Sequence, residues 1–197
     1  MKIFRIIIII LAAAIVLVAI ALSVIQKGHE SQGTLPVLYE LPDFTFTERQ
    51  GVLFGKNDFL GKISIVDFIF TNCPGPCPFM SSKMAELYQA YSNTNKVQFV
   101  SISVDPNRDS LNVLKEYANR FGVYDKRWFF LRAPMLEVIN LYENGFKLGG
   151  ILPVDHSTKF ILVDQNATIR GYYDCYDQIS MKILKTHIRE LAGKLSY

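Results

Sequence analysis

Cysteine and histidine are scarce in this sequence, and it has neither a long basic run nor an internal repeat. The 197 residues include three cysteines and three histidines, and 21 Lys and Arg against 18 Asp and Glu give a net charge of +3. Because the basic residues are scattered, we expect no nucleic-acid partner. The length suits one domain with some accessory sequence and is too short for two domains of ordinary size.

The N-terminal region contains the one long stretch without charge, residues 6–25. As a helix this stretch is long enough to span the hydrocarbon core of a bilayer. Lys2 and Arg5 precede it, which predicts that residues 1–5 are cytoplasmic. A cleaved signal peptide ending near Ala19–Ala21 is the alternative, although the stretch is longer than the usual signal core of ~7–15 residues.

The rest of the chain is predicted to be exported on either interpretation of the N-terminus. No Arg- and Ser-rich transit sequence precedes the apolar stretch, so we expect a single-pass protein of a bacterial inner membrane, with its domain in the periplasm or otherwise outside the cytoplasm. Residues 26–40 are polar, with Gly and Pro, as a linker should be. Residues 41–197 are predicted to form the domain.

This domain alternates strand and helix patterns. Apolar and polar residues alternate around Gln50-Gly51, which predicts a β-hairpin, and Ile63–Phe70 has the continuous apolar pattern of a strand buried on both faces. The other predicted elements are a helix beginning near Pro78, strands over 97–104 and 127–133, helices over 111–121 and 133–145, a hairpin over 159–173, and a closing helix over 178–195 with Ile183, Leu184, Ile188 and Leu191 facing inward. This order predicts an α/β fold, a mixed sheet covered by helices in three layers.

Two of the three cysteines, Cys73 and Cys77, follow the first buried strand and are separated by Pro-Gly-Pro. They lead into a helix N-terminus, where backbone N–H groups and the helix dipole favour a thiolate. A thiolate serves both disulfide exchange and metal ligation, so this feature leaves both open. A purely structural disulfide is disfavoured, because closing so short a loop contributes little stability.

His156 precedes the predicted strand that starts at Lys159, where a sheet can bring it beside the cysteine turn. Two thiolates and an imidazole suit Cu(I), and the same donors suit Zn²⁺ with an open fourth position. For a single histidine, a structural role is the alternative.

Three further features have both functional and structural interpretations. Asp105 is a candidate for site electrostatics or partner docking, and equally for a turn residue before a proline. Asp109 and Ser110 are predicted to cap the following helix. Cys175 lies outside the cysteine turn and is predicted to be inert, a resolving thiol or an intermolecular partner being the alternatives.

The segments TNCPGPCP, ISVDPNRDS and VDHSTKFILVD, in this order behind one apolar segment, resemble the Sco/SenC (PrrC-like) family of copper-binding cytochrome c oxidase assembly proteins. The resemblance extends from about Leu41 to the C-terminus and implies a thioredoxin-like fold. It implies Cys73, Cys77 and His156 as ligands of Cu(I), and also of Cu(II). It further implies assembly of the CuA centre, with the copper-bearing oxidase subunit as partner. The Pro-Gly-Pro spacer departs from the family pattern, in which a polar and an aliphatic residue more often follow the first proline.

The sequence therefore predicts a membrane-anchored copper metallochaperone that is not an enzyme in the strict sense. The alternative is a thiol-disulfide oxidoreductase that reduces the cysteines of the oxidase copper subunit and is itself reduced by a thiol reductase. In that case Cys73 attacks and Cys77 resolves. A peroxidase-like sensor ranks last, because it needs one especially reactive cysteine rather than a pair.

Overall fold

The computed structural model describes residue 16 and residues 35–195. The described residues from Pro36 onward form a compact unit of their own. No helix among the described residues is long and apolar enough to cross a membrane. The predicted anchor, residues 6–25, lies outside the described residues except for Val16, as do the predicted cytoplasmic residues 1–5.

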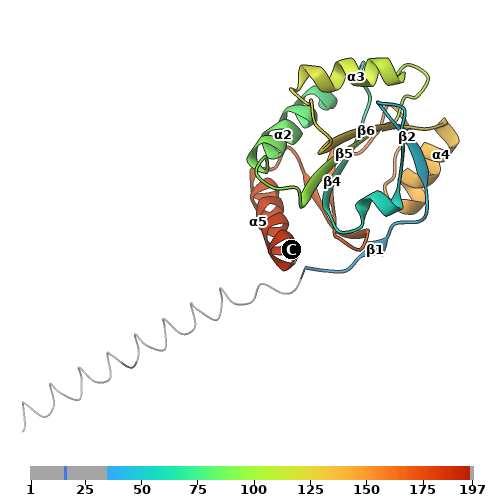
Figure 1. The fold of residues 1–197 in the computed structure, drawn as a ribbon. Coiled ribbons are helices and arrows are strands. Elements are labelled where there is room, and N and C mark those ends of the chain that lie inside the picture. The colour runs from blue at the N-terminus through green and yellow to red at the C-terminus, as the bar shows by residue number, and fades with distance from the viewer. Residues whose placement is uncertain (1–15, 17–34, 196–197) are drawn as a thin grey trace, which may run out of the picture. The chain divides into compact units, whose positions relative to one another are not determined.

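An eight-stranded mixed sheet forms the centre of this unit, in the order β1-β8-β7-β4-β5-β6-β2-β3 (Figure 1). The pairs β4–β5 and β5–β6 are parallel, and the other neighbours are antiparallel. The strands are β1 (Tyr39–Glu40), β2 (Thr45–Glu48), β3 (Leu53–Gly55), β4 (Ile63–Ile69), β5 (Val97–Ser103), β6 (Trp128–Arg132), β7 (Lys159–Val163) and β8 (Thr168–Asp174). The predicted mixed α/β sheet is confirmed.

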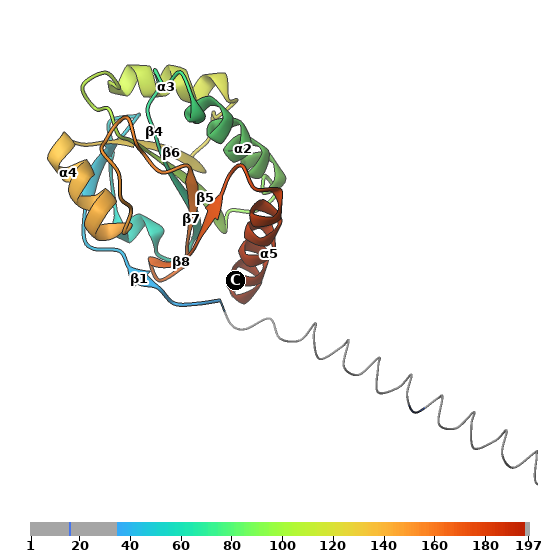
Figure 2. The ribbon, with the colours of Figure 1, turned by 180° about the vertical axis from the view of Figure 1, so that it is seen from behind.

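Helices cover both faces of the sheet (Figures 1 and 2). α2 and α5 lie side by side over one face, and α4 lies over the other. The helical elements are η1 (Lys56–Phe59), α2 (Pro76–Ala90), α3 (Leu111–Arg120), α4 (Met135–Asn140), the π-helical turn η2 (Leu141–Gly145) and α5 (Gln178–Lys194). With helices on both sides, every residue of β4 and of β5 is buried, as the pattern of Ile63–Phe70 predicts.

The side chains of β4 alternate between the two layers of core. Val66 and Phe68 belong to the hydrophobic cluster that includes Tyr142 and Phe146 from the α4–η2 region. The Phe68 ring meets both aromatic rings edge-on, at centroid distances of 4.9 and 5.2 Å. The alternate residues of β4 face α2 and α5, which places Asp67 in the layer beneath the cysteine turn.

Several predicted boundaries and faces change in the structure. α2 begins at Pro76 rather than near Pro78, because Gly75 occupies the N-cap and Pro76 has the φ angle of a first helical residue. In α5, Leu184, Ile188 and Leu191 are buried as predicted, but the prediction for Ile183 is wrong, since 44% of its surface is exposed. Adjacent helical residues differ by about 100° in direction, so Ile183 and Leu184 cannot both face the sheet fully.

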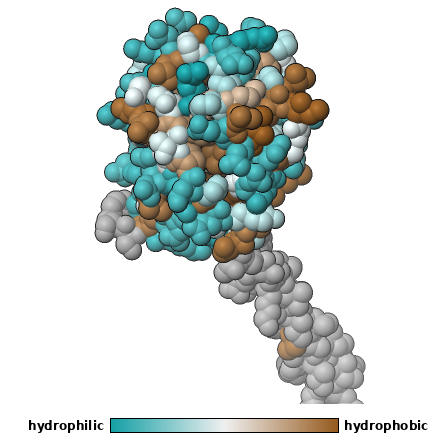
Figure 3. All heavy atoms as spheres, turned by 90° about the vertical axis from the view of Figure 1, so that its right-hand side faces the viewer, coloured by the Kyte–Doolittle hydropathy of each residue, from teal (hydrophilic) through white to brown (hydrophobic). Residues whose placement is uncertain are grey.

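Strand β1 lies within the segment predicted as a linker. Tyr39 and Glu40 pair with β8, and the flanking Leu38 N–H donates to the Ile169 carbonyl oxygen at 3.0 Å. At the opposite edge, β2 and β3 form the predicted hairpin, and Gly51 has a φ of +84° that favours glycine. The face seen in Figure 3 is mixed, with patches of hydrophobic residues separated by hydrophilic ones.

Candidate metal centre

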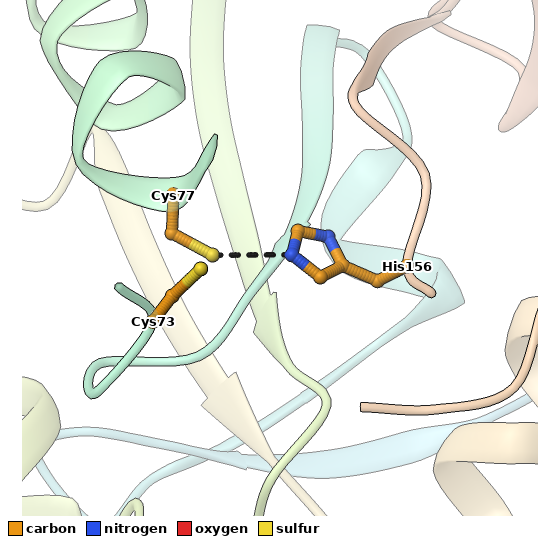
Figure 4. A group of neighbouring side chains, drawn as sticks. All are labelled: Cys73, Cys77 and His156. Carbon is orange, nitrogen blue, oxygen red and sulfur yellow. Dashed lines mark hydrogen bonds between the residues drawn. The ribbon is translucent and has the colours of Figure 1, made fainter. Parts of the chain in front are cut away.

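Cys73, Cys77 and His156 converge at the end of β4 (Figure 4). Their two sulfur atoms and one ring nitrogen all lie within 4.8 Å of one another. Cys77 Sγ lies 3.2 Å from His156 Nε2. The structure thus brings together the three side chains predicted from the sequence.

The cysteine turn is shaped by backbone groups that point at the sulfur atoms. The Gly75 N–H donates to Cys73 Sγ, and the Phe70 N–H donates to Cys77 Sγ, both at 3.4 Å. Cys77 occupies the first turn of α2 and is fully buried, whereas Cys73 is partly exposed. All three cysteines of the chain, including Cys175, are free thiols in this structure.

His156 is held in place by the loop before β7 and by the core beneath it. Its Nδ1 lies 3.2 Å from the Ser157 carbonyl oxygen, and its ring meets the Phe70 ring edge-on at 5.5 Å. The Tyr142 hydroxyl accepts a hydrogen bond from the Ser157 N–H at 2.8 Å and donates to the Gly149 carbonyl oxygen at 3.0 Å. The Tyr142 hydroxyl therefore connects η2 to Ser157, the residue that follows His156.

Burial sets the protonation of the two inner donors. It lowers the pKa of His156, which favours the neutral imidazole. The tautomer with the proton on Nδ1 donates to the Ser157 carbonyl and leaves the Nε2 lone pair facing Cys77. Burial also raises the pKa of the Cys77 thiol, and this effect outweighs the hydrogen bond that the Phe70 N–H donates to its sulfur atom. A bound cation is then the natural means of converting this thiol to a thiolate.

These donors fit a soft metal ion. Two sulfur atoms and an unprotonated imidazole nitrogen, already gathered at the mouth of one turn, are the ligand types of Cu(I). Cys73 also lines an open hollow of about 550 Å³ that is bounded by Phe70, the prolines of the turn, Arg108 and Val154. This opening leaves one side of the donor set accessible to a partner.

Asp105 lies in the turn after β5 rather than among the donors. It is largely buried, its carboxylate is 3.5 Å from Arg108, and its backbone carbonyl accepts hydrogen bonds from the Arg108 and Asp109 N–H groups. These contacts fit the turn role of Asp105. Its role in site electrostatics or partner docking stays a prediction.

Asp109 has a role that the sequence analysis missed. Ser110 caps α3 as predicted, accepting a hydrogen bond from the Val113 N–H. The fully buried Asp109 carboxylate instead accepts hydrogen bonds from the Thr71 hydroxyl and the Ser103 hydroxyl, both at 2.6 Å, and from the Thr71 N–H at 3.3 Å. It ties the end of β5 to the residue two positions before Cys73. The sequence offered one signal for this role, namely that Asp109 is the second acidic residue of SVDPNRDS. The same position also suits a helix cap, so the signal did not distinguish the two roles.

Comparison with known proteins assigns the family. The sequence model of the SCO1/SenC family matches residues 36–192. The chain belongs to this family. The SCO1 protein homolog of Bacillus subtilis (strain 168) is 35% identical over 146 residues, covering 71% of this chain and 76% of that protein. The mitochondrial protein SCO1 of Saccharomyces cerevisiae is 32% identical over 139 residues, covering 61% of this chain and 44% of that protein.

Solved Sco structures share the fold. A SCO1/SenC family lipoprotein from Bacillus anthracis str. Ames gives a TM-score of 0.71 at 31% identity, covering 78% of this chain and 95% of that one. BsSco, a member of the Sco family of cytochrome c oxidase assembly proteins, gives a TM-score of 0.74 at 26% identity, covering 83% of this chain and 99% of that one. Yeast Sco1 with copper bound gives a TM-score of 0.62 at 25% identity, covering 81% of this chain and 96% of that one. The resemblance to the Sco/SenC family and its thioredoxin-like fold are confirmed.

Proposed function

We propose that this Sco/SenC protein is a membrane-anchored copper metallochaperone that assists assembly of the CuA centre of cytochrome c oxidase. The observation that carries the proposal is the convergence of Cys73, Cys77 and His156 within 4.8 Å, with Nε2 facing Cys77. Two family-level facts support it: yeast Sco1 has been solved with copper bound, and BsSco belongs to a family of oxidase assembly proteins. The partner is the copper-bearing oxidase subunit.

Copper is the cargo in this scheme. Both thiols lose their protons when they become ligands, and the neutral His156 supplies its nitrogen without a proton change. The site is specific for soft ions because two of its three donors are sulfur, and Cu(I), with Cu(II) as a second state, is the ion we assign.

The unequal exposure of the two thiols suggests an order of transfer. Cys73 is partly exposed and lines the open hollow, while Cys77 and His156 are buried. An incoming thiolate or imidazole of the partner therefore reaches the ion from the Cys73 side and replaces that ligand first. The transfer is an exchange between similar ligand sets, so the protein needs no catalytic turnover.

We place the domain outside the cytoplasm of a bacterium, held to the inner membrane by residues 6–25. The support is the uncharged apolar stretch with Lys2 and Arg5 before it. One relative from Bacillus anthracis is described as a lipoprotein, and the yeast relatives are mitochondrial.

The second candidate function is disulfide reduction of the same oxidase subunit. The observation that favours it is the pairing of a partly exposed Cys73 with a buried Cys77 on a helix N-terminus. In this reaction the Cys73 thiolate attacks a partner disulfide and releases one partner thiolate. Cys77 then attacks the mixed disulfide, leaving a Cys73–Cys77 disulfide and the reduced partner. A separate thiol reductase must restore the pair. A disulfide switch has been identified in BsSco.

A Cu(I) titration of the reduced full-length chain against a competing chelator tests the assignment. We expect one tightly bound Cu(I) per chain, and no bound Cu(I) in Cys73→Ser/Cys77→Ser. In His156→Ala the Cu(I) affinity should fall at least about 100-fold, which is more than the ~10–100-fold loss typical when a residue that only supports a ligand is removed. His187→Ala is the matched control, because His187 is a partly buried histidine that hydrogen-bonds to Tyr173 rather than to the cysteine turn. Equal copper affinity in His156→Ala and the parent, with disulfide reduction intact, would reject the metallochaperone in favour of the reductase.

A further inference from the structure

A groove between α2 and α5 lies beside the candidate metal centre and has no role in the site chemistry above. It has a volume of about 380 Å³, and we call it the Phe79–Tyr176 groove. It is lined by Phe79, Lys83 and Glu86 of α2, by Cys175 and Tyr176, which precede α5, and by Gln178, Met181, Lys182 and Lys185 of α5. α2 and α5 lie side by side in both ribbon views (Figures 1 and 2).

An aromatic pair forms part of the groove lining. The Phe79 and Tyr176 rings stack nearly parallel, with centroids 4.6 Å apart and an interplanar angle of 5°. The two residues are 39% and 54% exposed. Exposed, preordered aromatic rings are the residues that most often carry binding energy in protein interfaces, because little conformational entropy is lost when a partner covers them.

Positive charge exceeds negative charge along the groove. Its lining contains three lysines and one glutamate, and Lys83 pairs with Glu86 at 2.7 Å. Within the described residues no carboxylate forms an ion pair with Lys182 or Lys185, so two of the three lysines have no ion-pair partner. The neighbouring carboxylates, Asp174 and Asp177, accept hydrogen bonds from the Tyr176 and Ile179 N–H groups. The groove is thus complementary to an acidic surface.

The groove is close to the copper ligands without covering them. Phe79 follows Cys77 by two residues on α2. Because each helical residue turns by about 100°, Phe79, Lys83 and Glu86 all lie about 180–240° around the helix axis from Cys77 and so share one side of α2. The groove and the Cys73 hollow share no lining residue, so a protein seated in the groove leaves the Cys73 opening free.

We infer that the Phe79–Tyr176 groove docks an acidic segment of the copper-bearing oxidase subunit, and that this contact holds the subunit beside Cys73 during copper exchange. The inference rests on the proposed function. Lys182 and Lys185, which form no ion pair among the described residues, attract the segment, and the stacked rings of Phe79 and Tyr176 cover its apolar part.

The test measures binding of the full-length chain, in a mild detergent, to the purified soluble domain of the copper-bearing oxidase subunit. Lys182→Glu/Lys185→Glu reverses the groove charge, and Tyr176→Ser removes half of the aromatic pair. The matched control, Lys115→Glu/Lys126→Glu, makes the same change of charge at two exposed lysines outside the groove. We expect each groove variant to bind at least about tenfold more weakly, the control to change less than about twofold, and the parent to lose affinity between about 50 and about 300 mM salt.

Cu(I) affinity of each chain alone, measured in parallel, separates this inference from the proposed function. If the parent holds no Cu(I), the proposed function fails. If the parent holds Cu(I) but does not bind the subunit domain, or if the groove and control variants bind it equally, the docking inference is overturned. A concentration-dependent dimer of the parent that the groove variants cannot form also overturns it, since the groove then contacts a second copy of this chain.

Discussion

Asp67 provides the sharpest test of the energetics of this fold, because its carboxyl group is fully buried in β4. One carboxyl oxygen accepts a hydrogen bond from the Ser101 hydroxyl at 2.6 Å, and the other has no hydrogen-bond partner among the described residues. Burial raises the pKa of Asp67 to about 7, from an ordinary value of 3.8. The folded protein therefore retains this proton over a pH range in which the unfolded chain releases it.

The consequence for stability has a definite sign. Between the two pKa values the native state binds more protons than the unfolded state, so the free energy of unfolding falls as the pH rises from about 4 to about 7. The favourable contribution of the protonated group is complete below the unfolded pKa and is lost once the pH passes the folded pKa. Three pH units at about 1.4 kcal/mol each make the loss on the order of 4 kcal/mol, which is an upper limit.

Asp67→Asn removes this titration while keeping the shape of the side chain. The amide oxygen can accept the Ser101 hydrogen bond, and the amide is neutral at every pH. We expect parent and variant to have similar stability near pH 4. At about pH 8 the variant should be the more stable, by up to about 4 kcal/mol.

Urea unfolding of the reduced chains at about pH 4 and about pH 8 measures this difference. Glu116→Gln, at an exposed position of α3, is the control and should follow the parent at both pH values. A difference between Asp67→Asn and the parent that stays constant with pH, or a variant that is less stable at pH 8, would refute the reasoning.

Three further substitutions test the supports of the site. Asp109→Ala leaves the Thr71 and Ser103 hydroxyls without their acceptor, and should reduce the free energy of unfolding in urea by about 2–4 kcal/mol. Tyr142→Phe removes the hydroxyl that holds Ser157, and should cost about 1–3 kcal/mol by the same measurement and weaken Cu(I) binding in the chelator titration. Cys175→Ala should leave one Cu(I) bound per chain and cost about 1 kcal/mol, since this thiol is buried outside the donor set. Loss of the bound copper in Cys175→Ala would contradict that assignment.

Short sequence patterns predicted the parts of the fold that depend only on neighbouring residues. The apolar run of β4 and the glycine turn at Gly51 are properties of a few adjacent residues, and both are confirmed. The start of α2 was misplaced because three prolines surround the turn and the choice among them depends on Gly75 as N-cap. The exposure of Ile183 depends on how α5 rotates against its neighbours, which the helical period alone does not fix.

The site was predictable for a different reason. Cys73 and Cys77 stand out by sequence alone, but His156 is 79 residues after Cys77, and only the ordered motifs of the resemblance selected it over a structural histidine. The buried Asp109 and Tyr142 were not selected, because the partners through which they support the site, Thr71 and Ser157, are 38 and 15 residues away and no spacing rule connects them. Supporting contacts of this kind follow from tertiary packing.

The antiparallel pairing of β4 with β7 determines when the site can exist. β4 leads directly to the cysteines, and β7 begins three residues after His156. In an unfolded chain the histidine is separated from the cysteines by a long loop, so the two-sulfur, one-nitrogen donor set forms only after the centre of the sheet has assembled. A newly synthesised chain must therefore fold before all three donors can hold copper, and full copper occupancy marks a chain that has completed its sheet.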